Sequence, residues 1–80
     1  MESKIFTIEI DEQGNLIEMH VNKDGAEYLR SILDNLIRAN ENSDKHLMTP
    51  DWGGTELSSE SQNKADGVRI VHHLKLMYWK

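Results

Sequence analysis

Residues 29–37 read LRSILDNLI, and this stretch decides the fold class of the 80-residue chain. Its apolar residues fall at positions i, i+3, i+4, i+7 and i+8, the pattern of a helix with one apolar face. The helix is predicted from about Gly25 to about Asn40. Two residues are candidate N-terminal caps: Asn22, and Asp24, which a glutamate follows three positions later as in a capping box.

Two strands are predicted before this helix. Lys4–Ile10 (KIFTIEI) and Leu16–Val21 (LIEMHV) are rich in apolar and β-branched residues, and a short polar loop containing Gly14 separates them, as in a β-hairpin. Alternation along each strand predicts one face that points to the core: Phe6, Ile8, Ile10, Ile17, Met19 and Val21. The other face is mixed and is expected to be more exposed: Ile5, Thr7, Glu9, Leu16, Glu18 and His20.

Two more strands are predicted after the helix. Lys45–Thr49 (KHLMT) is short and should end at Pro50, because proline cannot donate to a sheet ladder. Residues 58–67 are polar and predict a mobile loop. Val68–Trp79 (VRIVHHLKLMYW) predicts a long strand, with a bulge near its adjacent histidines at 72 and 73. Neighbours on a strand point to opposite faces, so at most one of these histidines is expected in any single site.

The order β-β-α-β-β predicts a single α+β domain over residues 1–80. It should have two layers: a mainly antiparallel four-stranded sheet and one helix packed on one of its faces. A single helix cannot cover both faces of such a sheet, so the second face should face water or a partner. The residues expected on that open face include Glu9, Glu18, His20, His73, Lys75, Met77 and Trp79.

Charge and composition narrow the classes of function. The net charge is −5, and residues 1–44 carry ten Asp/Glu against four Lys/Arg. Nucleic-acid binding needs clustered basic residues, so a basic protein partner is the better expectation. No cysteine and no long apolar run occurs, and residues 1–4 lack the features of a signal peptide. The sequence therefore predicts a cytoplasmic protein without a membrane segment.

The residues that carry catalysis are largely missing. The four histidines do not have the spacing of a zinc site, and no G-x-S-x-G nucleophile turn or phosphate-binding glycine loop occurs. An 80-residue domain also has little room for a deep pocket. We therefore predict a protein that is not an enzyme and that holds neither a metal nor a cofactor.

The segment His46–Leu57 (HLMTPDWGGTEL) gathers the turn-forming residues of the chain. Pro50 fixes one turn position, while Gly53 and Gly54 supply backbone freedom, so these three residues predict a structural turn. Trp52 has two interpretations, which the sequence leaves open. It either seals one end of the core or stands at the surface as a contact for a partner.

This segment also resembles the signature of the immunity protein 32 family of bacterial polymorphic toxin systems. The residues that carry the resemblance are His46-Leu47-Met48-Thr49, Pro50, Trp52-Gly53-Gly54, Glu56-Leu57-Ser58, and His73-Leu74-Lys75-Leu76 with Trp79. The resemblance implies an antidote that binds and neutralises a cognate protein toxin, and the acidic first half would suit a basic nuclease. The expected contact residues are Trp52, Asp51, Glu56, Glu9, Glu18 and Trp79. The alternative is a structural module that forms a homodimer through the open sheet face.

Overall fold

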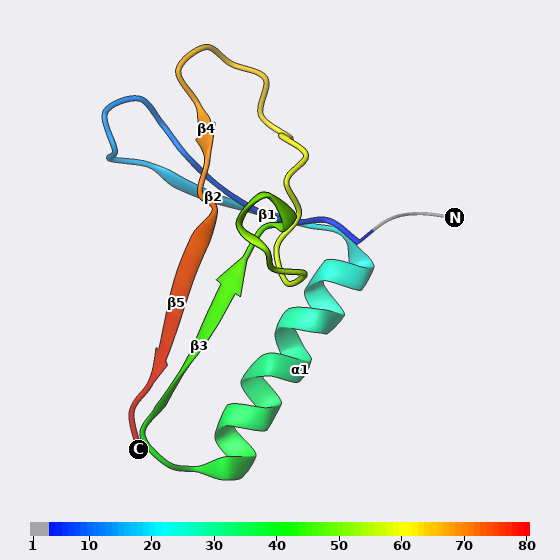
Figure 1. The fold of residues 1–80 in the computed structure, drawn as a ribbon, viewed down its shortest axis with the longest axis vertical. Helices are drawn as coiled ribbons and strands as arrows, with labels where there is room; N and C mark the ends of the chain where they lie inside the picture. The colour runs from blue at the N-terminus through cyan, green and yellow to red at the C-terminus, as the bar shows by residue number, and fades with distance from the viewer. Residues whose placement is uncertain (1–3) are drawn as a thin grey trace.

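The computed structural model describes residues 4–80 and has an α+β fold, as the sequence predicts (Figure 1). Its elements are β1 (Phe6–Ile10), β2 (Ile17–Val21), α1 (Lys23–Ala39), β3 (Ser43–Met48), the 3-10 turn η1 (Pro50–Trp52), β4 (Arg69–Ile70) and β5 (His73–Tyr78). Within this range, no helix has both the length and the apolar character that a membrane span requires. The expectation about a signal peptide concerns mainly residues 1–3, which lie outside the described residues.

The strands form two antiparallel sheets, so the prediction of one four-stranded sheet is wrong. One sheet has the order β2-β1-β4, and the other pairs β3 with β5. The chain passes between them at residues 71 and 72. The Val71 amide donates to the Ile8 carbonyl at 2.8 Å, whereas the His72 carbonyl accepts from the Thr49 amide at 3.0 Å. The predicted strand 68–79 is therefore divided between the sheets, where only a bulge was expected.

Core packing gives a physical reason for this division. Val71, Leu74 and Leu76 all pack against the buried core. In an unbroken strand Val71 would point to the face opposite Leu74 and Leu76, because side chains alternate. Interrupting the strand before His73 lets all three apolar side chains face the same interior.

Asn22 caps the helix, and Asp24 does not. The Asn22 side-chain oxygen accepts from the Gly25 amide and from the Ile5 amide, both at 2.9 Å. One side chain thereby satisfies the helix start and joins it to the segment that leads into β1. The helix ends at Asn40, which is left-handed with φ 49° and whose amide donates to the Leu36 carbonyl at 3.0 Å.

The core is small and draws on both sheets, on α1 and on the segment after η1. Its buried apolar residues are Phe6, Ile8, Ile32, Leu47 and Leu57. The Tyr28 ring of α1 meets the Phe6 ring edge-on, with 6.3 Å between the ring centroids. The helix therefore covers the predicted apolar face of β1.

The apolar face of β2, in contrast, is exposed. The register pairs Ile17, Met19 and Val21 with the apolar residues of β1, so the face is the predicted one. Their exposed fractions are nevertheless 64%, 52% and 41%, and the prediction that they lie in the core is wrong. The reason is that β2 is an outer strand, and the rest of the described chain does not cover it.

Candidate functional site

The segment after β3 folds into a tight turn that begins at a proline. Pro50 is the first residue of the 3-10 turn, and the amides of Trp52 and Gly54 both donate to the Thr49 carbonyl at 2.9 Å. Gly53 has φ +87°, which side chains with a Cβ adopt rarely. A Cβ on Gly54 would lie 2.5 Å from the Met48 carbonyl oxygen. Glycine is therefore required at both positions for different reasons.

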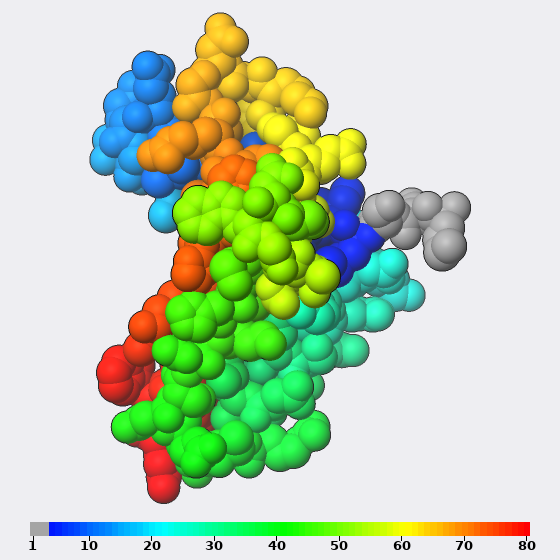
Figure 2. Space-filling view, in the orientation of Figure 1, coloured from blue at the N-terminus to red at the C-terminus, as the bar shows by residue number. Residues whose placement is uncertain are grey.

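The chain then returns along β3, so the turn is anchored on both sides. The Leu57 amide donates to the Met48 carbonyl at 3.1 Å, and the Leu57 side chain is buried in the core. The Ser58 amide donates to the Phe6 carbonyl at 2.8 Å, which connects the segment to β1. In the space-filling view this green to yellow-green part of the chain lies near the centre of the visible face (Figure 2).

Trp52 stands at the surface on this anchored turn. Its side chain is 59% exposed, so it does not seal the core. Its ring stacks on the His72 ring with 5.8 Å between centroids and 6° between planes, and it also lies 6.3 Å from the His73 ring. The structure thus brings both adjacent histidines to one residue. The prediction that only one of them could join a single site is wrong, because the strand is interrupted between β4 and β5.

Histidine contacts extend this cluster onto β3. His46 Nδ1 and His73 Nε2 are 2.8 Å apart, and Thr49 Oγ1 lies 2.8 Å from His72 Nδ1. We call Trp52, His46, His72 and His73 the Trp52 patch. In the His46–His73 pair one ring nitrogen must donate and the other accept, so the rings hold each other in place while at least one is neutral. Across residues 4–80 no group of three or more His, Cys, Asp or Glu side chains could hold a metal ion.

Two predicted acidic contacts lie on the same turn. Asp51 is exposed beside Trp52. Glu56 is half-buried, and its Oε1 accepts from the Met48 amide at 3.1 Å. This hydrogen bond is the main reason why the pKa of the Glu56 carboxyl lies below its ordinary value. The Glu56 side chain is therefore already used to fix the turn, whereas the Asp51 side chain stands at the surface.

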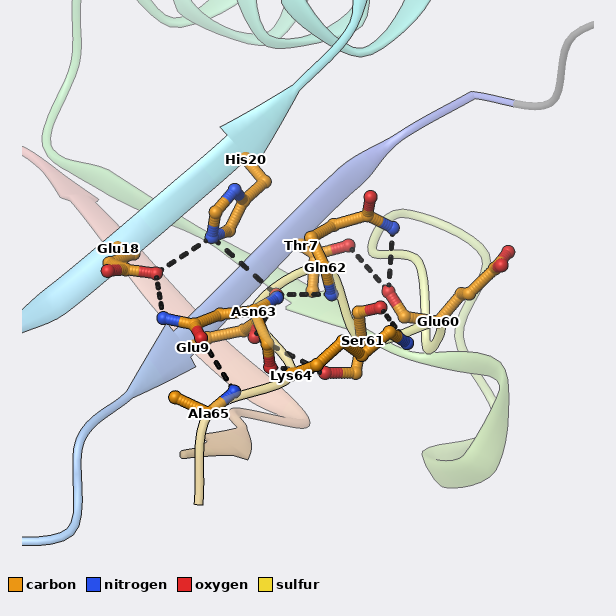
Figure 3. A network of polar contacts seen from close by, with 10 residues as sticks. All are labelled: Thr7, Glu9, Glu18, His20, Glu60, Ser61, Gln62, Asn63, Lys64 and Ala65. Carbon is orange, nitrogen blue, oxygen red and sulfur yellow. Dashed lines mark hydrogen bonds and ion pairs between the residues drawn. The ribbon is translucent and has the colours of Figure 1, made fainter. Parts of the chain in front are cut away.

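Glu9, another predicted contact, is fully buried, and its placement on an open sheet face is wrong. Residues 58–67 lie over this side of β1 and direct polar groups at the carboxylate (Figure 3). Glu9 Oε2 accepts from the Gln62 amide at 2.9 Å, and Oε1 accepts from the Asn63 amide at 3.1 Å. The Ser61 hydroxyl donates to Oε1 at 3.4 Å. The segment predicted as a mobile loop is thus bound to the sheet, and Glu9 is its anchor.

Glu18 lies beside this anchor and is partly exposed. Its Oε1 accepts from Asn63 Nδ2 at 3.1 Å and lies 2.9 Å from His20 Nε2. The hydrogen bond from Asn63 and then that from His20 hold the pKa of the Glu18 carboxyl below its ordinary value. Glu18 therefore binds the segment 58–67 as well as offering a charge to solvent (Figure 3).

This lowered pKa predicts a loss of stability in acid. The ionised carboxylate stabilises the folded state in full above the unfolded-state pKa of about 4.3, and this stabilisation disappears as the pH falls through the lower folded-state pKa. Replacing Glu18 by glutamine should therefore flatten the dependence of the unfolding free energy on pH below about pH 4.3. Urea unfolding followed by circular dichroism at a series of pH values measures this slope. Asn63→Ala removes the first donor and should also reduce the slope; an unchanged slope in Glu18→Gln would contradict the assignment.

Trp79 lies far from the Trp52 patch. It follows the end of β5, whereas His73 of the patch begins that strand, so the length of the strand separates them (Figure 1). Its side chain is 72% exposed and lines, with Met77 and Tyr78, a shallow hollow at the open end of the β3–β5 pair. The structure brings Trp52, Asp51 and Glu56 together, and it leaves Trp79 on a separate surface.

The contacts of Trp52 with His72 and His73, and of His73 with His46, were not predicted from the sequence. His46 and Met48 share a face of β3, and the register of β3 with β5 sets Met48 opposite His73, so that His46 and His73 become diagonal neighbours. That register could not be read from the sequence.

Comparisons of the chain with protein families, with curated proteins and with solved structures found no match.

Proposed function

We propose that this protein is a cytoplasmic antidote that binds and neutralises a toxin domain, with the Trp52 patch at the centre of the contact. The observation that carries the proposal is an exposed tryptophan on a turn that backbone hydrogen bonds hold to β3. A large aromatic side chain that is already ordered loses little conformational entropy on binding, and such residues are enriched among the strongest contacts of interfaces. The resemblance of residues 46–58 to the immunity protein 32 family supports the same function.

The electrostatics support a basic partner. Asp51 is exposed beside Trp52, and the chain carries a net charge of −5. A negative surface speeds the encounter with a positive one, and this effect weakens as salt screens the charges. A toxin that acts on nucleic acid has such a basic surface, because it must bind phosphates. We therefore propose a nuclease as the kind of toxin that this antidote binds.

The experiment begins by identifying the partner. Tagged protein is used to capture proteins from a lysate of the native host, and those retained after a high-salt wash are identified by mass spectrometry. The proposal expects a stoichiometric partner that carries a toxin domain, whose activity falls when the antidote is added. Recovery of the bait alone would count against an antidote and in favour of a structural module.

With the partner in hand, Trp52→Ala tests the contact. It should weaken binding by about 2 kcal/mol or more, which is about 30-fold in the dissociation constant, and should leave the fold intact because the ring is exposed. Calorimetry measures the affinity, and thermal unfolding checks the fold. Met77→Ala is the matched control, since Met77 is also exposed but lies near the far end of β5. If Trp52→Ala unfolds the domain, or binds as the parent does, the Trp52 patch is not the contact.

A further inference from the structure

The outer edge of β2 is a surface that the antidote function does not use. β2 pairs only with β1 in the described structure, and its other edge has no neighbouring strand. Proteins usually protect such an edge with charged side chains, lysine above all, or with proline, a bulge or a very short strand. β2 has no lysine, proline or bulge: it is five residues long, reads IEMHV, and pairs in unbroken register with β1. Its one acidic side chain, Glu18, is already bonded to Asn63 and His20. Its exposed apolar side chains add a reason for another strand to bind there.

The hydrogen-bond pattern shows which backbone groups face that edge. The Asp11 amide donates to the Leu16 carbonyl at 3.0 Å, and the Asn22 amide donates to the Ile5 carbonyl at 3.2 Å. In an antiparallel ladder, residues of one strand alternate between pointing to their neighbour and pointing away. Leu16, Glu18, His20 and Asn22 therefore point their backbone groups to β1. The amides and carbonyls of Ile17, Met19 and Val21 point outward, to the free edge.

The side-chain order of β2 is self-complementary about its central residue. Reading outward from Met19, each direction gives one ionisable residue and then one branched apolar residue. The ionisable residues have opposite character, because Glu18 lies on one side and His20 on the other. A second copy of the strand, rotated by a two-fold axis through Met19, would place unlike ionisable groups opposite each other and apolar groups opposite each other.

We propose that this protein forms a two-fold dimer in which β2 pairs antiparallel with β2 of a second copy, centred on Met19. In this register Met19 faces the partner's Met19, and Ile17 faces the partner's Val21. All three outward-pointing residues then exchange backbone hydrogen bonds with the partner strand. The two three-stranded sheets join into one continuous sheet, and the apolar side chains form a single row on one face.

The opposite face of the joined sheet explains why the occupant is a second copy. There, Glu18 lies directly opposite the partner's His20, in a pair of the closely spaced kind in which side chains approach best. Glu18 and His20 are already hydrogen-bonded within one chain, so two copies together make a ring of alternating carboxylates and imidazoles. A strand from an unrelated protein would match the apolar row, but this two-fold charge order matches the chain itself. A shift by one residue would destroy both matches.

Light scattering over a concentration series tests the dimer. We expect a mass of twice the 9.3 kDa of the chain at high concentration, falling to 9.3 kDa on dilution. Met19→Lys places two like charges together on the axis and should raise the dissociation constant of the dimer by about tenfold or more. Ile17→Lys, at an even more exposed position, is a second disrupting variant, and circular dichroism checks that both fold. Met77→Lys changes an exposed methionine on β5 and should behave as the parent.

Single cysteines test the register, because the chain contains no other thiol. In Met19→Cys the two Cα atoms would lie about 5.5 Å apart across the axis, a separation that a disulfide can span. In Ile17→Cys they would be displaced by four residues, or about 13 Å along the strands. Mild oxidation should therefore cross-link Met19→Cys and leave Ile17→Cys monomeric.

Three results would overturn the proposal. One is a parent protein whose mass stays at 9.3 kDa at every concentration. If Met19→Lys then also failed to bind a toxin, the β2 edge would be the binding surface for that toxin and not for a second copy. Another is a folded Met19→Lys variant that dimerises as the parent does. The last is equal cross-linking of both cysteine variants, which would mean another register. Each result leaves the test of Trp52 unaffected, because the residues of the Trp52 patch lie in β3, in η1 and at the start of β5, with His72 directly before β5, and none of them lies in β2.

Discussion

Replacing Glu9 by alanine should lower the free energy of unfolding by about 3 kcal/mol, because the change leaves two part-buried amide donors without their acceptor. The carboxylate is fully buried and accepts from the amides of Gln62 and Asn63 and from the Ser61 hydroxyl. A small domain has only about 5 kcal/mol of net stability, so this single change would remove more than half of it. Urea unfolding followed by circular dichroism measures the change.

Glu9→Gln is the matched control for this prediction. Its amide oxygen still accepts one hydrogen bond but offers no second acceptor and no charge, so the expected loss is about 1 kcal/mol. A loss below this value in Glu9→Ala would show that water replaces the carboxylate, and that residues 58–67 are not held by it. Because Glu9 is buried, neither variant should change the affinity of the folded fraction for a partner.

Gly25→Ala should destabilise the domain by about 2 kcal/mol or more, although helix propensity alone predicts the opposite sign. Alanine is the better helix former by about 1 kcal/mol, and Gly25 lies in the first turn of α1. In the folded structure, however, a Cβ at this position would overlap the backbone carbonyl of Ile5. A backbone group cannot rotate away as a side chain can, so the start of α1 would have to shift away from Ile5.

The sign of the change in unfolding free energy shows whether helix propensity or the close approach to Ile5 dominates at the start of α1. The Asn22 side chain bonds both Gly25 and Ile5, so a displaced helix start also strains the cap. Asp34→Ala, at an exposed position of the same helix, is the control and should stabilise by about 0.5 kcal/mol through propensity alone. If Gly25→Ala also stabilised the protein, the close approach of α1 to residue 5 would be disproved.

Local patterns predicted most of the elements. The apolar period of residues 29–37 places α1, and the alternating runs on either side of Gly14 place β1 and β2. Pro50 and the glycines mark the turn, because their effects on the backbone are local. Asn22 was one of two candidate caps, and the structure selects it because its side chain also reaches the Ile5 amide.

The same patterns did not show which face of a strand is buried. Alternation assigned Glu9 to the exposed face and Met19 to the core, and the structure has Glu9 buried and Met19 exposed. Both errors have one cause: a strand pattern shows which residues share a face, and it does not show what covers that face. The polar segment 58–67 covers Glu9 and donates backbone amides to it. Every residue except proline carries such an amide, so the residue types of this segment do not indicate the contact.

What the sequence alone determined, then, is the helix, the first three strands and the turn, and which residues of β1 and β2 share a face, because these depend on interactions between near neighbours in the chain. Only the tertiary structure decided the division into two sheets, the burial of Glu9, and the contacts that join Trp52 to His72 and His73 and His73 to His46. Each of these depends on contacts between segments far apart in the sequence. The physical reason is that burial and strand pairing are set by the competition of all segments for one small core, and that competition is settled only when the chain is folded.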